Sequence, residues 1–238
     1  MRLPWMLATA IFFAVSPHTL PAQLRPWRPL FVSRTETLTN PSGSTVVSHT
    51  RFGRRGDGSW SRLEISKDPD GVERSHLEFA DFTRLLSIRA DPVTRSVSTF
   101  SISRNEVNAL ISSEPDFAPC DGREQRRDLP HGHLLGMDVV LLTDRFEGYQ
   151  EARWVAPMLD CFPLEVTERN ARGMVKDSVA NMASPSQPPI WMFQAPAGYV
   201  ERSPREIQSL YMRAIPGAEY LPPDLLEAAE SRYHAGRR

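Results

Sequence analysis

The sequence predicts a mainly β fold of the α+β class, a curved antiparallel sheet with a few helices packed against it. Between residues 29 and 102, segments that alternate apolar and polar residues recur at near-regular spacing, and Pro, Gly, Asp and Asn separate them. Residues 151–166 show the same pattern in one hairpin, where Phe162, Leu164 and Val166 alternate with more polar neighbours beyond a Pro157–Asp160 corner. Such a hairpin is typical of a sheet that curves over a core.

The first 22 residues have the order of a secretory signal. Arg2 supplies the positive charge, residues 3–15 are apolar, and a short polar stretch ends in Ala22. The apolar run is shorter than the ~20 residues of a membrane span. We expect cleavage after Ala22 rather than after Ala14, where the polar region would be missing. The mature chain of 216 residues is then exported, to the periplasm or the exterior.

The charge of the mature chain excludes a general affinity for polyanions. Loss of Arg2 leaves 27 Lys and Arg against 29 Asp and Glu, a net charge of −2. A chain of this balance has no general attraction to nucleic acid or to an anionic membrane surface. No stretch after the signal approaches the length of a transmembrane segment.

The first half of the mature chain predicts a meander of six strands. Turn residues separate them; Asp68-Pro69-Asp70-Gly71, for example, combines a proline that fixes φ with a glycine that permits positive φ. The expected strands are Leu30–Thr39, Thr45–Phe52, Trp60–Ser66, Val72–Phe79, Phe82–Arg89 and Val93–Ile102.

A short helix and a long loop follow the meander. Ser103 and Glu106 form a capping box, and apolar residues at helical spacing follow up to Ile111. The loop, residues 113–132, holds Cys120. Two cysteines in an oxidising compartment predict a Cys120–Cys161 disulfide, which stabilises by about 3–4 kcal/mol in the chain-entropy model; the alternative is two separate thiols.

The second half predicts a further set of strands and two terminal helices. Residues 184–189 form a linker, and the apolar residues 190–193 are expected to dock on the sheet. Ser203 caps the first of the two helices. The division is a domain at 23–200 and a helical extension at 201–238. The expected strands are Leu134–Leu142, Ala152–Ala156, Cys161–Glu168 and Met174–Met182, and the helices are Pro204–Arg213 and Pro223–Tyr233.

Residues 29–200 resemble a group of exported bacterial half-barrel proteins. The resemblance rests on the stretch 135–140 leading into 152–157, and on an F-x-x-P-x-x-Y segment formed by Phe193, Pro196 and Tyr199. The group includes periplasmic lipoprotein carriers and periplasmic regulators of envelope-stress sigma factors. It implies a half-barrel whose apolar concave surface holds an acyl chain or a partner. The paired cysteines and the C-terminal helices depart from the carriers, so lipoprotein transport is not carried over.

The sequence contains no motif that assigns a reaction. Glycine-rich phosphate loops, nucleophile elbows and zinc-protease helices are absent. Cys120, Asp128, His131 and His133 are the one His/Cys cluster, but a bridged sulfur supplies no thiolate and two histidines fall short of the usual ligand set. We therefore expect no catalytic residue, no metal and no cofactor.

Four aromatic residues are the candidates for binding. Trp60, Trp154, Phe162 and Trp191 either line a pocket for an apolar ligand or form the core between sheet and helices. The first hypothesis is an exported, non-enzymatic protein that binds an apolar ligand or an envelope protein on its curved sheet. The alternatives are an interaction domain of the cell envelope without a pocket and, less favoured, a metal-binding or hydrolytic enzyme.

Overall fold

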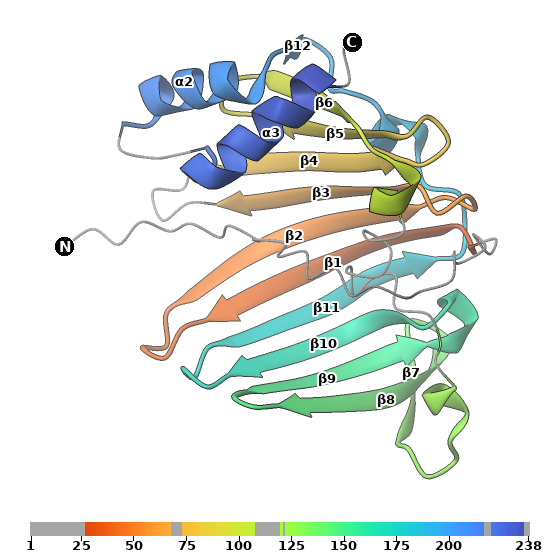
Figure 1. Ribbon diagram of the computed structural model, residues 1–238. Coiled ribbons are helices and arrows are strands. Elements are labelled where there is room, and N and C mark those ends of the chain that lie inside the picture. The colour runs from red at the N-terminus through yellow and green to blue at the C-terminus, as the bar shows by residue number, and fades with distance from the viewer. Residues whose placement is uncertain (1–26, 68–72, 108–119, 121, 217–219, 236–238) are drawn as a thin grey trace.

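The protein is a curved, unclosed antiparallel sheet with helices at one end, as the computed structural model shows (Figure 1). The structure describes residues 27–67, 73–107, 120, 122–216 and 220–235. One sheet of 12 strands has the order β12-β6-β5-β4-β3-β2-β1-β11-β10-β9-β8-β7. The predicted half-barrel of the mainly β class is confirmed. The predicted capping box of Ser103 and Glu106 forms, and residues 104–107 are helical. The predicted signal (1–22), the Asp68–Gly71 turn and residues 108–111 of that helix lie outside the described ranges.

Apart from β12, each half of the chain forms one half of the sheet, and β1 joins the halves through β11. The first half contributes β1 (Leu30–Thr39), β2 (Thr45–Arg54), β3 (Trp60–Lys67), β4 (Glu73–Asp81), β5 (Leu86–Asp91) and β6 (Ser96–Ser101). The second half contributes β7 (His131–Leu134), β8 (Met137–Phe146), β9 (Tyr149–Ala156), β10 (Phe162–Asn170), β11 (Val175–Ser184) and β12 (Val200–Glu201). The short β12 was not predicted, and it pairs parallel to β6.

The fifth and sixth strands begin later than predicted, because an aspartate builds a turn before each. Asp81 accepts a hydrogen bond from the backbone N–H of Arg84, and Leu85 then has φ 54°. Asp91 accepts one from the backbone N–H of Thr94 in the same way. Residues 82–85 and 92–95 were predicted as strand because they contain β-formers. The hydrogen bond from a backbone N–H to a nearby aspartate side chain favours the turn more than these residues favour a strand.

The predicted strand Leu134–Leu142 is two strands. Leu135 and Gly136 have φ of 50° and 78°, which makes a tight hairpin between β7 and β8. His131 and Gly132, which were assigned to the end of a long loop, therefore belong to the edge strand β7. β9 also begins earlier than predicted, since Gly148 with φ 72° closes a tight turn directly after β8.

Two α-helices follow the sheet, as predicted: α2 (Pro204–Ala214) and α3 (Pro223–Ala235). The capping box at the start of α2 is formed by Ser203 and Glu206. The helices lie across the β4–β6 end of the sheet (Figure 1), where Tyr233 meets Phe100 edge-to-face at 6.5 Å between ring centroids. Within the described ranges, no helix combines the length and apolarity that crossing a bilayer requires.

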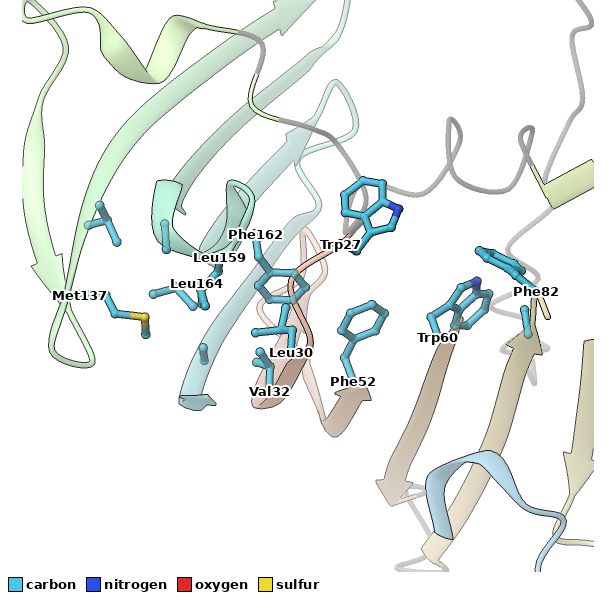
Figure 2. Packing of buried hydrophobic residues seen from close by; sticks show 14 of the residues in the cluster. Trp27, Leu30, Val32, Phe52, Trp60, Phe82, Met137, Leu159, Phe162 and Leu164 are labelled. Atoms are coloured by element: carbon cyan, nitrogen blue, oxygen red, sulfur yellow. The ribbon is translucent and has the colours of Figure 1, made fainter. Parts of the chain in front are cut away.

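The largest hydrophobic cluster lies where the two halves of the sheet meet (Figure 2). Leu30 and Val32 of β1 are fully buried there, and the ring of Phe52 stacks on Phe162 at 5.4 Å. The 3-10 helix η3 (Pro157–Leu159) turns the chain between β9 and β10 at the predicted corner and places Leu159 in the same cluster. Burial of such side chains stabilises by about 1.5–3 kcal/mol each.

A buried arginine fastens this corner to the start of β1. The side chain of Arg54 is fully buried and forms an ion pair with Asp160 at 2.9 Å. It also donates to the carbonyl oxygens of Arg28 and Leu159, and its guanidinium lies 4.6 Å from the ring centroid of Trp27. One charge thus connects β2, the entry to β1 and the corner before β10.

The predicted disulfide is present. Cys120 and Cys161 are bonded, with Cα atoms 5.2 Å apart and a sequence separation of 41. Cys161 packs with Val140, Leu142 and Val155 in a small cluster of its own. The bridge therefore holds the segment before β7 against β8 and β9.

Candidate functional site

A row of apolar side chains crosses β3, β4 and β5 on one side of the sheet. Leu63 pairs with Leu77, and Leu77 pairs with Ala90, so the three side chains are neighbours on one face. Adjacent strand positions such as Glu78 point to the opposite face, because side chains alternate along a strand. The row is the floor of the candidate site.

The predicted docking of residues 190–193 supplies the wall above this floor. The 3-10 helix η4 (Ile190–Phe193) buries Met192 and Phe193 against the sheet. Ser61 Oγ donates to the carbonyl oxygen of Met192 at 2.5 Å, and Phe193 meets Phe79 edge-to-face at 6.2 Å. The docked turn leaves the neighbouring Trp191 43% exposed.

A cavity of about 350 Å³ lies between η4, the stretch that follows it and the three strands. Leu63, Leu77 and Ala90 form its floor, and Trp191, residues 194–197 and Tyr199 form its walls. Its volume is at the lower end of the range for small-molecule sites, about 300–1,000 Å³. Since residues 194, 195 and 197 are exposed, the site is an open groove, which we call the η4 groove.

Few polar side chains line the η4 groove. Gln194 offers an amide and Tyr199 a phenol. Burial raises the pKa of Tyr199, and the nearby negative charge of Asp91 raises it further, while Arg95 acts in the opposite direction. Tyr199 therefore stays protonated at neutral pH and can donate a hydrogen bond. An amide and a protonated phenol orient a ligand, but neither is a base for proton abstraction.

The four predicted aromatic residues do not lie together. Trp60 and Phe162 are 3% and 1% exposed and belong to the main core (Figure 2). Trp154 packs against that core and against the backbone of Gly132. Trp191 alone of the four lines the η4 groove. Ligand binding by the set stays a prediction, and Trp191 is the member that the groove supports.

The side of the sheet that faces α2 and α3 carries charged groups. Glu36 lies 3.1 Å from Arg34 and 3.4 Å from Lys176, and Glu78 lies 2.9 Å from Arg89. Burial by itself raises the pKa of Glu78, but Arg89 and other nearby positive charges hold it below its usual value. A surface of paired charges does not favour binding of an apolar chain, since desolvation of the charges costs free energy.

The His/Cys cluster does not form a metal site in the part of the chain that the structure describes. The sulfurs of Cys120 and Cys161 lie near Glu124, but they are bonded to each other and cannot act as thiolate ligands. His131 and His133 are exposed on the edge strand β7, where His133 Nδ1 lies 3.1 Å from Asp138. Asp128 pairs with Arg126 instead.

Sequence reasoning missed most of the η4 groove. The F-x-x-P-x-x-Y segment includes its walls Pro196 and Tyr199, so that segment was a usable signal. In the sequence, the floor residues appear only as part of the apolar–polar alternation of two predicted strands. That alternation does not show that residues 190–199 pack over them. Arg51, which lies beside the groove, carried no signal at all.

The chain aligns with several solved structures at low similarity. They include MucB in complex with MucA(peri) (14% identity, TM-score 0.39) and a LolA superfamily protein from Nitrosomonas europaea (11%, 0.32). A DUF1329 family protein from Desulfovibrio piger aligns at 11% identity and a TM-score of 0.30. The names of MucB and of the LolA superfamily protein agree with the groups that the sequence resembles.

The extent of these alignments differs among the neighbours. They cover 74%, 72% and 68% of this chain respectively, and 56% of the MucB chain, 92% of the LolA superfamily protein and 87% of the DUF1329 protein. Since every TM-score is below 0.5, no ligand, partner or activity is assigned to this chain from them. No family model and no curated protein matches the chain.

Proposed function

We propose that this chain is an exported, non-enzymatic binding protein that takes the apolar part of a small ligand into the η4 groove. The observation that carries the proposal is the groove itself, about 350 Å³ of space with an apolar floor and an exposed tryptophan at its wall. Exposed Trp beside a preformed apolar pocket is typical of ligand sites, because an aromatic ring supplies a large contact area at little entropic cost.

Export and the absence of an activity are supported by separate features. The signal-like first 22 residues and the Cys120–Cys161 bridge both fit an oxidising compartment outside the cytoplasm. The polar groups of the groove, Gln194 and Tyr199, suit hydrogen bonding rather than acid–base or nucleophilic chemistry.

The test is an NMR titration of the labelled mature protein with a neutral apolar probe, 4-phenylbutanol. We expect saturable shifts of the Trp191 indole N–H signal and of the backbone amide signal of Gln194 in the unmodified protein, and no saturable shift of that amide in Trp191→Ala. Ile190→Ala is the matched control, since Ile190 is 68% exposed in the same turn and does not line the groove. Equal affinities of the two variants, or no saturable shift in the unmodified protein, would overturn the proposal.

A natural ligand is sought by solvent extraction of the purified mature protein, followed by mass spectrometry. A compound recovered from the unmodified protein and absent from Trp191→Ala identifies the occupant. Recovery of the same compound from both proteins would place its binding site elsewhere.

A further inference from the structure

Arg51 of β2 stands at the end of the apolar floor. It pairs with Leu63 across β2 and β3, so it continues the row that Leu63, Leu77 and Ala90 form. Its guanidinium lies 6.0 Å from the ring centroid of Trp191. Contact with the tryptophan face places a positive charge beside the wall of the groove.

This charge has no carboxylate to balance it in the described part of the chain. No ion pair joins the exposed Arg51 to an acid there, unlike the paired Arg84 and Arg89. The residues around it on the same face are Ser33, His49, Gly53 and Leu63, none of them acidic. An exposed arginine can stay solvated, but one fixed beside an apolar groove offers a planar double donor to an anion.

We propose that the ligand of the η4 groove is a compact apolar carboxylate, with its apolar body over Leu63, Leu77 and Ala90 and its anion against Arg51. This inference rests on the proposed function and adds the chemical class of the ligand. The apolar floor and the unbalanced cation at its end are complementary to a molecule with those two parts.

The dimensions and the lining favour a compact small molecule over an extended peptide. A volume of about 350 Å³ suits a single ring or a short branched chain. Peptides in sheet grooves depend on a series of backbone hydrogen bonds. The side chains of the lining offer only Gln194 and Tyr199 as polar partners, and Pro196 has no N–H to donate.

The experiment compares three isosteric probes on the mature protein by the same NMR titration: 4-phenylbutyrate, 4-phenylbutanol and 4-phenylbutylamine. We expect the carboxylate to bind about 3- to 10-fold more tightly than the alcohol at low ionic strength, as for an exposed to half-buried ion pair. The amine should bind more weakly than the alcohol. The preference for the carboxylate should fall in 0.5 M NaCl, where charges are screened within a few Å.

The variant Arg51→Gln should bind the carboxylate and the alcohol equally. Arg145→Gln makes the same charge change on an exposed residue of β8, in the other half of the sheet, and should keep the preference. Equal binding of carboxylate and alcohol to the unmodified protein, or a preference that survives in Arg51→Gln, overturns the ligand class and leaves the proposed function standing. Failure of all three probes to bind overturns the proposed function itself.

Two further probes test the size and the kind of ligand. Decanoate should bind no more tightly than 4-phenylbutyrate, because the longer chain extends beyond the floor. A pentapeptide that ends in a free phenylalanine carboxylate should also bind no more tightly. A clear gain for either probe contradicts the compact small molecule.

Discussion

At the scale of single residues, the buried charge of Arg54 connects the parts of the main core. Its fully buried side chain is held by Asp160 and by two backbone carbonyl oxygens. Removal of the arginine costs free energy, because it leaves the carboxylate of Asp160 without its cation and the carbonyl oxygens of Arg28 and Leu159 without this donor.

We predict that Arg54→Met lowers the free energy of unfolding by about 2–4 kcal/mol. Urea denaturation followed by circular dichroism measures the change. Arg84→Met is the control, since its pair with Asp81 involves an arginine side chain that is 59% exposed, and it should cost less than about 1 kcal/mol. Equal losses in both variants would contradict a structural role specific to Arg54.

The carboxylates of the charged side predict a pH dependence of stability. Burial alone raises the pKa of Glu78 and of Glu36, yet neighbouring cations, Arg89 for Glu78 and Arg34 for Glu36, hold both below the usual 4.5. The unfolded chain therefore takes up protons before the folded chain does. Stability is complete above about pH 4.5 and is lost as the pH falls through the lowered pKa values.

We predict that the free energy of unfolding falls below pH 4.5 and that Glu78→Gln reduces the slope. Urea denaturation between pH 3 and pH 7 measures both. An unchanged slope in Glu78→Gln would show that this carboxylate does not contribute to the acid sensitivity.

At the scale of elements, the η4 groove depends on close contact between β2 and the segment before η4. A Cβ on Gly53 would lie 2.7 Å from Cβ of Pro188, so the glycine is required for this approach. We predict that Gly53→Ala displaces the η4 turn, destabilises by about 1–3 kcal/mol and weakens binding of 4-phenylbutyrate.

Gly56→Ala is the control for this prediction. A Cβ there meets its nearest atom at 3.6 Å, an ordinary contact. The NMR titration and urea denaturation should find this variant close to the unmodified protein. Normal binding in Gly53→Ala would mean that the position of η4 does not depend on the contact.

The disulfide acts on a different element, the segment before β7. We predict that Cys120→Ser with Cys161→Ser costs about 3–4 kcal/mol, chiefly through the greater entropy of the unfolded chain. Binding in the η4 groove should remain, because the bridge joins that segment to the corner before β10. Thiol labelling of the denatured, unreduced protein should find no free cysteine; two labelled cysteines would contradict the bridge.

Elements were predictable from sequence where the local signal agreed with the tertiary contacts. The α2 capping box, the Pro157–Asp160 corner and the alternation in β1–β3 are local patterns, and each forms as expected. β5 and β6 were placed too early because Asp81 and Asp91 hold the backbone in turns. The strand β12 has two residues, and it pairs with β6 across a long separation in sequence, which no local pattern predicts.

At the scale of the whole molecule, the sheet has two distinct sides with different content. The side toward α2 and α3 carries paired charges beside the main aromatic core, and the η4 groove lies on the opposite side of β3–β5. The sequence predicted a curved sheet with aromatic residues but could not divide these residues between core and site. Whether an aromatic residue is buried in the core or lines the groove depends on which side of the sheet it lies on and on what packs there. Trp60 is buried and Trp191 is half-exposed, although the two are the same residue type.

Stability and binding should therefore respond to different aromatic residues. Phe162→Leu removes ring contacts in the core and should cost about 1–3 kcal/mol of stability. Trp191→Ala removes a half-exposed ring and should cost little stability.

The most direct test is the affinity of the mature protein for 4-phenylbutyrate in these two variants, measured by NMR titration under conditions where both are folded. Trp191→Ala should lose at least about ten-fold in affinity, the equivalent of about 1.4 kcal/mol, while Phe162→Leu should stay within about two-fold of the unmodified protein. A loss of affinity in Phe162→Leu together with normal binding in Trp191→Ala would contradict a ligand site in the η4 groove.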